Sequence, residues 1–287
     1  MPNVREIRRR MRGVENIQQI TQAMKMVAAS KLRRTQMAVA RSRPYTQKLQ
    51  GVLSTVITSM GEINHPLFVE KPLKKVCLVL ITADKGLAGG YNTRVQRLAL
   101  EEAERYAEQG VKVDFLALGE KGRAYLKRRE QEIKKVVTGI NDVPTFDEAQ
   151  KLARFLVNIY LNEEYDRIYL VYQEFVTTVQ QRPIVKQFLP LVYEKDETAL
   201  EEEYIYEPSP QAVLSILLPR YINNLAFHLL TETKASEHGA RMTAMTSATD
   251  NAEEMLEELR LSYNRSRQAN ITREISEIVG GADALEA

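Results

Sequence analysis

Hydrophobic residues in the first sixty positions recur with helical spacing. They lie three or four residues apart, at Val4, Ile7, Met11, Val14, Ile17, Ile20, Met24 and Val27. The pattern resumes after Pro44, so we expect one helix over about residues 3–58 with a kink or local break at that proline. A helix of this length would extend about 80 Å, far more than a small globular domain needs.

The end of the chain predicts a second long helix. Ser209 is a suitable N-cap and Pro210 a suitable first helical residue. The pattern continues to about Ile278, where Gly280 and Gly281 are expected to stop the helix. Its apolar positions are Val213, Ile216, Leu217, Leu225, Leu229, Met242, Met245, Ala252, Leu256, Leu259, Tyr263, Ile275 and Ile278. The simplest way to bury the stripes of both helices is to wrap them as an antiparallel coiled coil.

Between these helices the pattern changes to short apolar runs that alternate with amphipathic segments. The expected strands are 75–82, 111–119, 133–137, 166–175 and 183–191, and the expected helices are 93–109, 122–129 and 146–161. Alternation of this kind indicates a doubly wound α/β sheet. The predicted fold class is therefore α/β, with a Rossmann-like domain (70–195) inserted between the coiled-coil helices (1–60 and 208–280).

The net charge of +2 hides a strong asymmetry along the chain. Residues 1–50 carry twelve Lys and Arg against only Glu6 and Glu15, whereas residues 194–207 are strongly acidic. This polarity suggests an anionic partner for the basic end. One reading is nucleic-acid binding through phosphate contacts. The other is a helix surrounded by protein, which the consecutive Arg8, Arg9 and Arg10 favour because they point around the helix rather than along one face.

Residue types that carry chemistry are sparse. Cys77 is the only cysteine, so it has no disulfide partner in the chain, and its apolar surroundings predict a buried, inert thiol. The sequence has no metal-binding His/Cys cluster, no nucleophile elbow and no G-x-x-x-x-G-K-[ST] phosphate loop. We therefore expect no catalytic residue, no metal and no cofactor. We also expect no signal peptide and no membrane span, because no apolar run approaches ~20 residues.

One glycine-rich loop follows the first predicted strand, where dinucleotide-binding folds hold phosphate. Its spacing is G-x-x-G-G, at Gly86, Gly89 and Gly90, and not G-x-G-x-x-G. A dinucleotide enzyme therefore stays possible, but a tight strand-to-helix turn is the favoured interpretation. Asp84 and Lys85 in this loop are candidates to cap the next helix or to pair with a partner.

Two helical stretches, residues 17–36 and 232–250, are poor in leucine and aromatic residues and rich in Ala, Ser, Thr and Met. Such residues form surfaces that repack easily and lack deep anchors. We therefore expect adaptable contact surfaces here, with Lys25, Lys31, Arg33 and Arg34 offered to acidic partners.

Five motifs carry a resemblance to a known family. They are ITQAMKMVAASKLRRTQ (20–36), ITADKGLAGGYN (81–92), YIYEPSP (204–210), SEHGARMTAMTSATDNA (236–252) and YNRSRQANITREISEIVGGADAL (263–285). Together they resemble the gamma subunit of bacterial F-type ATP synthase over essentially the whole chain. Ala88 departs from the cysteine that many relatives carry, and the cysteine pair of the chloroplast form is absent.

This resemblance implies a non-catalytic rotor. The coiled coil would turn inside a ring of alpha and beta subunits, while the α/β domain rests with epsilon on the membrane c-ring. Proton flow would drive rotation and thereby ATP synthesis in the beta subunits. The protein would lie peripherally at the cytoplasmic face of a bacterial plasma membrane. The sequence leaves open the coupling ion, the number of c subunits and the regulation of hydrolysis.

The resemblance also implies contact residues. Met24 and Lys25 match the neck that meets an acidic loop of beta, and Arg34 shares that role. Gln268, Thr272 and Glu274 match the catch contact with beta. Arg241 and Met242 match the part of the C-terminal helix beside the neck, and Tyr206 and Glu207 match the foot on the c-ring and epsilon.

Overall fold

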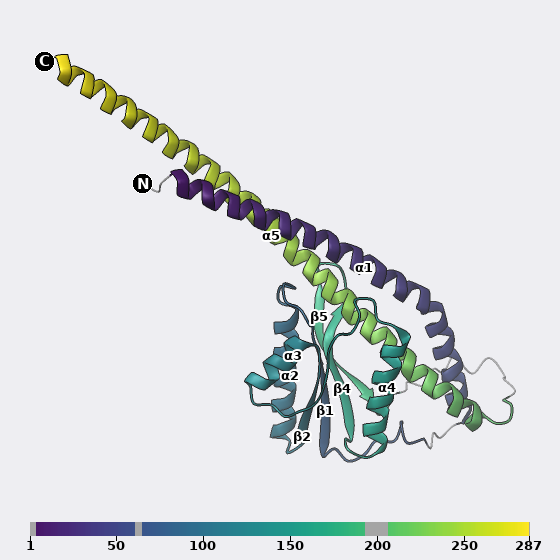
Figure 1. Cartoon of the computed structure of the whole chain (residues 1–287). Helices are drawn as coiled ribbons and strands as arrows, with labels where there is room; N and C mark the ends of the chain where they lie inside the picture. The colour runs from purple at the N-terminus through teal and green to yellow at the C-terminus, as the bar shows by residue number, and fades with distance from the viewer. Residues whose placement is uncertain (1–3, 61–64, 193–205, 287) are drawn as a thin grey trace. The chain divides into compact units, whose positions relative to one another are not determined.

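The computed structural model describes residues 4–60, 65–192 and 206–286, with side chains to residue 279 in the last range. Most of the acidic segment 194–207 lies outside these residues. The chain divides into two compact bodies (Figure 1). The small body comprises Met1–Val27 and Met242–Ala287, and the large body comprises Ala28–Arg241.

Ten elements make up the described chain, and their bounds agree closely with the sequence expectations. They are α1 (Val4–Met60), β1 (Lys75–Ile81), α2 (Tyr91–Glu108), β2 (Lys112–Leu118), α3 (Glu120–Arg128), β3 (Ile133–Val137), α4 (Phe146–Leu161), β4 (Arg167–Phe175), β5 (Gln181–Leu189) and α5 (Pro210–Glu286). The proline and glycines predicted to interrupt the two long helices do not break them. Pro44 lies inside α1 without interrupting it, and α5 continues through Gly280 and Gly281 rather than stopping there.

The strands form one sheet within the large body, in the order β3-β2-β1-β4-β5. The first four strands are parallel, and β5 pairs with β4 in the antiparallel sense. Leu78 at the centre of β1 pairs with Phe115 of β2 on one side and Tyr169 of β4 on the other. This order confirms the predicted Rossmann-like arrangement.

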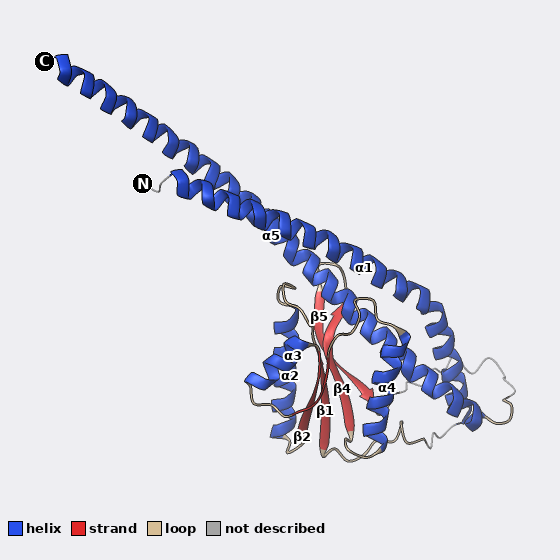
Figure 2. Cartoon of the chain, in the orientation of Figure 1, coloured by secondary structure: helices blue, strands red, loops and turns tan. Residues whose placement is uncertain are grey.

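Side chains of the central strand alternate between two hydrophobic cores. Val76, Leu78 and Leu80 face a core shared with α2 and α3. Cys77, Val79 and Ile81 face the larger core, which α4, the end of α1 and the first part of α5 complete. Figure 2 shows the sheet covered by helices on both faces. The apolar runs of β1 and β2 follow from this double coverage.

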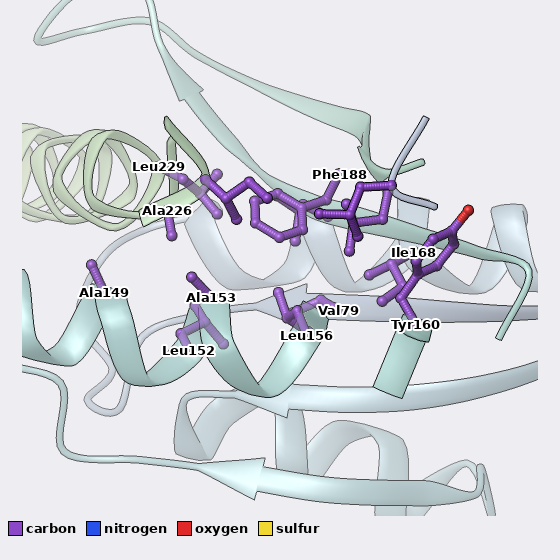
Figure 3. Packing of buried hydrophobic residues seen from close by; sticks show 14 of the residues in the cluster. Val79, Ala149, Leu152, Ala153, Leu156, Tyr160, Ile168, Phe188, Ala226 and Leu229 are labelled. Atoms are coloured by element: carbon purple, nitrogen blue, oxygen red, sulfur yellow. The ribbon is translucent and has the colours of Figure 1, made fainter. Parts of the chain in front are cut away.

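Helix α4 shows how sequence pattern becomes packing. A capping box begins it, because Thr145 accepts from the Glu148 amide and Glu148 accepts from the Thr145 amide. Small and large residues then alternate on its buried face. Figure 3 shows Ala149, Leu152, Ala153, Leu156 and Tyr160 along this helix, with Val79 and Ile168 of the sheet and Ala226 and Leu229 of α5 nearby. Alternation of this kind lets helices approach closely without voids.

In the small body, α1 and α5 pair through a seam with a regular 3-4 spacing. The least exposed positions of α1 are Ile7, Met11, Val14, Gln18 and Thr21, and those of α5 are Met245, Thr249, Ala252, Leu256, Leu259, Tyr263 and Ser266. Two contacts give the direction: Arg8 donates to the Tyr263 hydroxyl at 2.6 Å, and Thr249 donates to the Thr21 hydroxyl at 2.9 Å. The predicted antiparallel coiled coil is therefore confirmed in this body.

The residues that fill this seam differ from the predicted ones. Ile17, Ile20 and Val27 are 54%, 59% and 54% exposed, so the expectation that they belong to the buried stripe is wrong. The seam passes instead through their neighbours Gln18 and Thr21. On α5, Ile275 and Ile278 of the small body and Ile216 of the large body are likewise exposed. A heptad seam follows 3.5-residue geometry, and so it diverges from a stripe chosen by hydrophobicity alone.

Helix α5 also contains an 18-residue stretch, within Pro210–Val279, whose mean hydropathy of 1.2 would suit a membrane span by length and composition. The sequence pattern shows no uninterrupted apolar run of that length. A core helix of a water-soluble protein meets the same criterion, and 39% of this stretch is buried within the fold. The stretch is therefore weak evidence for a span.

Candidate partner-binding surfaces

The predicted neck residues lie on α1. Met24 and Lys25 are half-buried in the small body, and Arg34 is exposed in the large body. Exposed Ile17, Ile20, Met26 and Val27 lie near them in sequence. Apolar side chains left in solvent mark surfaces that bind other proteins when they gather together. The neck therefore presents adaptable apolar residues beside a lysine.

The predicted catch residues lie on α5 beyond the last seam residue. Gln268, Thr272 and Glu274 are all exposed, as are residues 271–279 throughout. Gln268 and Thr272 are four residues apart and share one face of the helix, whereas Glu274 points to another side. The structure therefore brings two of the three residues together. This part of α5 also exposes Ile275 and Ile278.

The predicted foot residues differ from each other. Tyr206 is half-buried and packs against the larger core, whereas Glu207 is exposed. The tyrosine therefore has a packing role within the chain, and only the glutamate is fully available to a partner.

The glycine-rich loop forms a tight turn, as predicted. Leu87 and Gly89 have positive φ angles of 61° and 54°, and α2 begins at Tyr91. Asp84 does not cap α2. Its carboxylate accepts from the amides of Glu120, at the start of α3, and of Gly139, each at 3.0 Å. Asp84 thus ties three segments at the carboxyl edge of the sheet.

This edge is where a Rossmann-type fold binds its nucleotide, and here α5 covers it. Ala240 of α5 packs with Ala83, Ala88 and the fully buried Tyr91, whose hydroxyl donates to the Thr233 carbonyl at 3.2 Å. Between Asp84 and Lys234 the remaining cavity measures about 10 Å³. That volume is about what one water needs. The part of the edge between Asp84 and Lys234 therefore has no room for a dinucleotide.

Residues 233–240 of α5 are all buried. The expectation of an adaptable surface over 232–250 is wrong for this part. Gly239 shows why: a Cβ there would lie 3.3 Å from the Thr178 carbonyl oxygen of the β4–β5 hairpin. The helix passes so close to the sheet edge that only a small residue fits. The polar pattern concealed this burial because it resembles that of an exposed helix.

Charged side chains inside this buried turn are paired. Glu237 accepts from Lys234 at 3.1 Å and from Arg241 at 2.8 Å. Burial alone would raise the pKa of Glu237, but the charges of Lys234 and Arg241 outweigh it and lower the pKa. Arg241 also donates to the Gly86 carbonyl at 3.4 Å. This predicted contact residue is therefore engaged within the large body, while Met242 is half-buried in the small body.

A second polar group joins α1 to the same region. Lys31 of α1 pairs with the carboxylate of Asp142 at 2.7 Å, and its side chain stays 37% exposed. Thr35 donates to the Asp142 carbonyl at 3.2 Å, and His238 Nε2 lies 3.1 Å from the same oxygen. Sequence reasoning missed Asp142 because its partners are far away in sequence. Among the described residues, no group of three or more His, Cys, Asp and Glu side chains is placed to hold a metal ion.

Fold and surfaces together define a coiled-coil protein with an inserted Rossmann-like domain whose nucleotide crevice is filled. A family profile described as ATP synthase matches residues 3–285. The ATP synthase gamma chains of Desulfitobacterium hafniense and Moorella thermoacetica are 47% and 48% identical to this chain, with 100% of each chain covered. The chain belongs to the ATP synthase gamma chain family.

Solved structures support the same fold. A chain of the Euglena gracilis mitochondrial ATP synthase is similar with a TM-score of 0.68, 19% identity and coverage of 98% of this chain and 94% of the other. A chain in the central stalk and c-ring structure of the Tetrahymena thermophila mitochondrial ATP synthase is similar with a TM-score of 0.57 and 24% identity, covering 80% of this chain and 99% of the other.

Proposed function

We propose that this chain is the central-stalk rotor subunit of a bacterial F-type ATP synthase. Family membership over the full length carries this proposal. The coiled coil would turn inside a ring of alpha and beta subunits, and the α/β domain would connect it to epsilon and the c-ring. Ion flow through the membrane would drive that rotation, and the beta subunits would make ATP.

The proposal assigns no catalytic residue to this chain. The filled crevice at the sheet edge supports a mechanical role, because α5 occupies the place where a nucleotide would bind. The protein would be peripheral to the membrane at its cytoplasmic face and attached through its partners.

The contact roles follow from the family resemblance. Met24, Lys25 and Arg34 would meet beta at the neck, and Gln268, Thr272 and Glu274 would meet it near the end of α5. Such contacts must differ between the states of beta, since a contact of equal strength in every state shifts no equilibrium. Arg241 and Met242 would support the neck, and Glu207 with Tyr206 would face the c-ring and epsilon.

Rotation can be tested with a single label on the chain. Cys77 is 1% exposed, and burial raises the pKa of its thiol to about 12, so a maleimide should not react with it. Exposed Lys127 on α3 offers a labelling site through Lys127→Cys. The labelled chain is assembled with alpha and beta subunits, and the label is followed during ATP hydrolysis.

The expected result is a stable complex that hydrolyses ATP while the label turns in one direction. The unlabelled wild-type chain, treated with maleimide, is the control for reaction at Cys77. A chain that forms no complex, or a complex that hydrolyses ATP without rotation, would reject the rotor function. Salt-dependent DNA binding at micromolar protein would favour the nucleic-acid alternative instead.

A further inference from the structure

The loop between β3 and α4 is held firmly to the α/β domain. Its Gly139 amide donates to Asp84 at 3.0 Å, and its Asn141 amide donates to Glu148 at 3.0 Å. The Thr145 capping box then joins the loop to α4. Asp142 therefore lies in a segment whose residues on either side, Asn141 and Thr145, are held by hydrogen bonds.

Asp142 contacts both terminal helices within the large body. Its carboxylate pairs with Lys31 of α1 at 2.7 Å. Its carbonyl oxygen lies 3.2 Å from the Thr35 hydroxyl of α1, whose single proton it shares with the Lys31 carbonyl at 2.9 Å, and 3.1 Å from His238 Nε2 of α5. One residue of the α/β domain thus contacts both helices.

These contacts are directional, unlike the apolar contacts around them. Ala28 and Leu32 of α1 are buried nearby, and apolar packing of this kind resists separation but permits sliding. Hydrogen bonds and ion pairs prefer particular distances and angles, and buried ones can select one register. Thr35 and His238 are buried, whereas the Lys31 and Asp142 side chains are 37% and 49% exposed, so water partly screens their ion pair.

We propose that Asp142 and its partners Lys31, Thr35 and His238 form a torque clasp that locks the α/β domain to α1 and α5. The inference rests on the proposed rotor function. A domain driven from the membrane side must pass its rotation to these helices, and a directional contact to both prevents them from slipping past the domain. Asp142 acts as a positioning residue, not as a contact with another subunit.

The test uses the complete ATP synthase in inverted membrane vesicles. Two quantities are measured on the same vesicles: the rate of ATP hydrolysis, and the ATP-driven proton uptake reported by quenching of a pH-sensitive dye. Their ratio reports coupling, and the amount of this chain in the purified complex reports assembly. If the coupling ion is Na⁺, uptake of ²²Na⁺ replaces the dye signal.

Asp142→Ala and Lys31→Met each remove the ion pair, from the loop side and the helix side. Both should lower ion uptake per ATP hydrolysed at least threefold while the chain still assembles. The exchange Lys31→Asp with Asp142→Lys should restore more than half of the lost coupling, because it remakes the pair in reverse. A merely structural role would change assembly and not this ratio.

Asp147→Ala is the matched control. Asp147 pairs with Lys151 at 2.6 Å on the exposed face of α4, and both side chains are more than half exposed. Removing that pair should leave coupling unchanged. Wild-type coupling in Asp142→Ala and Lys31→Met would overturn the clasp, as would failure of the exchange to restore any coupling. Should Asp142→Ala and Lys31→Met both prevent assembly, the clasp is a folding element and the proposal is also overturned.

Failure of the clasp leaves the proposed function intact, since wild-type vesicles would still couple. Failure of the proposed function is seen separately, as vesicles that need no copy of this chain for coupled ATP hydrolysis.

Discussion

Thr82 and Gly122 meet at the carboxyl edge of the sheet, where the Gly122 amide donates to the Thr82 hydroxyl oxygen at 2.7 Å. A Cβ on Gly122 would lie 2.9 Å from that oxygen and 3.2 Å from the Thr82 methyl carbon. The hydroxyl also donates to the Leu118 carbonyl at 3.1 Å, so it is not free to turn away. The close approach of α3 to β1 thus depends on glycine.

Gly122→Ala should therefore destabilise the large body, even though alanine favours helix. We expect a loss of about 1–3 kcal/mol in the free energy of unfolding, which is typical of overpacking. Gly51→Ala is the control, since a Cβ at Gly51 on α1 meets no atom within 4 Å. That change should stabilise the chain by up to about 1 kcal/mol. Urea unfolding followed by circular dichroism measures both, and equal effects would contradict the close approach.

Two leucines of α5 test the register of the coiled coil. Leu256 is 4% exposed in the seam, whereas Leu261 is 68% exposed. Leu256→Ala should lower the free energy of unfolding by about 2–5 kcal/mol, and Leu261→Ala by no more than about 0.5 kcal/mol. Loss of helical signal on heating is the measurement. A larger effect at Leu261 would mean that the seam lies on another face.

His238 should make stability depend on pH. Burial lowers its pKa below the ordinary value of 6.5, although Glu237 and Asp142 act in the opposite direction. As the pH falls through that ordinary value, the unfolded chain gains a proton that the folded chain does not bind. Stability from neutral His238 is therefore present above about pH 6.5 and declines below it.

The unfolding temperature of the wild-type chain should accordingly fall between pH 7.5 and pH 5.5, and His238→Gln should reduce that difference. Some dependence should remain, because burial also lowers the pKa of His65. His228→Gln, on an exposed residue of the same helix, is the control. If the unfolding temperature of His238→Gln falls between pH 7.5 and pH 5.5 as much as that of the wild-type chain, then the His238 imidazole titrates alike in the folded and unfolded states.

Lys25 tests the neck. Lys25→Glu should lower ATP synthesis several-fold in vesicles, because it places a negative charge against the acidic loop that the family resemblance implies. Lys25 is half-buried, so Lys25→Gln is needed to separate charge from packing. It should retain most of the activity, and Lys48→Glu at an exposed position of α1 should retain nearly all. Normal ATP synthesis by Lys25→Glu would remove this residue from the neck contact.

Much of this fold is readable from the sequence. The strands and helices of the α/β domain follow from apolar runs, and Phe146–Leu161 is predicted to the residue. The residues of the coiled-coil seam are harder to predict from the sequence. Gln18 and Thr21 occupy the seam, although the neighbouring Ile17 and Ile20 are more hydrophobic. A shift of one residue turns a helix by ~100°, so hydrophobicity alone chose the wrong face.

The surfaces were predicted less well than the fold. The sequence pattern predicts that Lys31 is a free basic residue, whereas the structure pairs it with Asp142, which is distant in sequence. His238 and Glu237 read as surface residues, yet the sheet edge buries them. Such contacts join segments about a hundred residues apart, and periodicity carries no information about them.

The regular 3-4 seam of the small body has a mechanical consequence. Helices joined through a 3.5-residue repeat wind around each other with a left hand. Twisting such a pair in one sense tightens the winding and presses the seam together, while twisting it in the other sense opens it. A shaft built this way is stiffer against one sense of twist than against the other. The sense of twist is the same in ATP synthesis and ATP hydrolysis, because the driving end and the loaded end change places when the rotation reverses. A seam wound to tighten under that twist would therefore tighten in both modes.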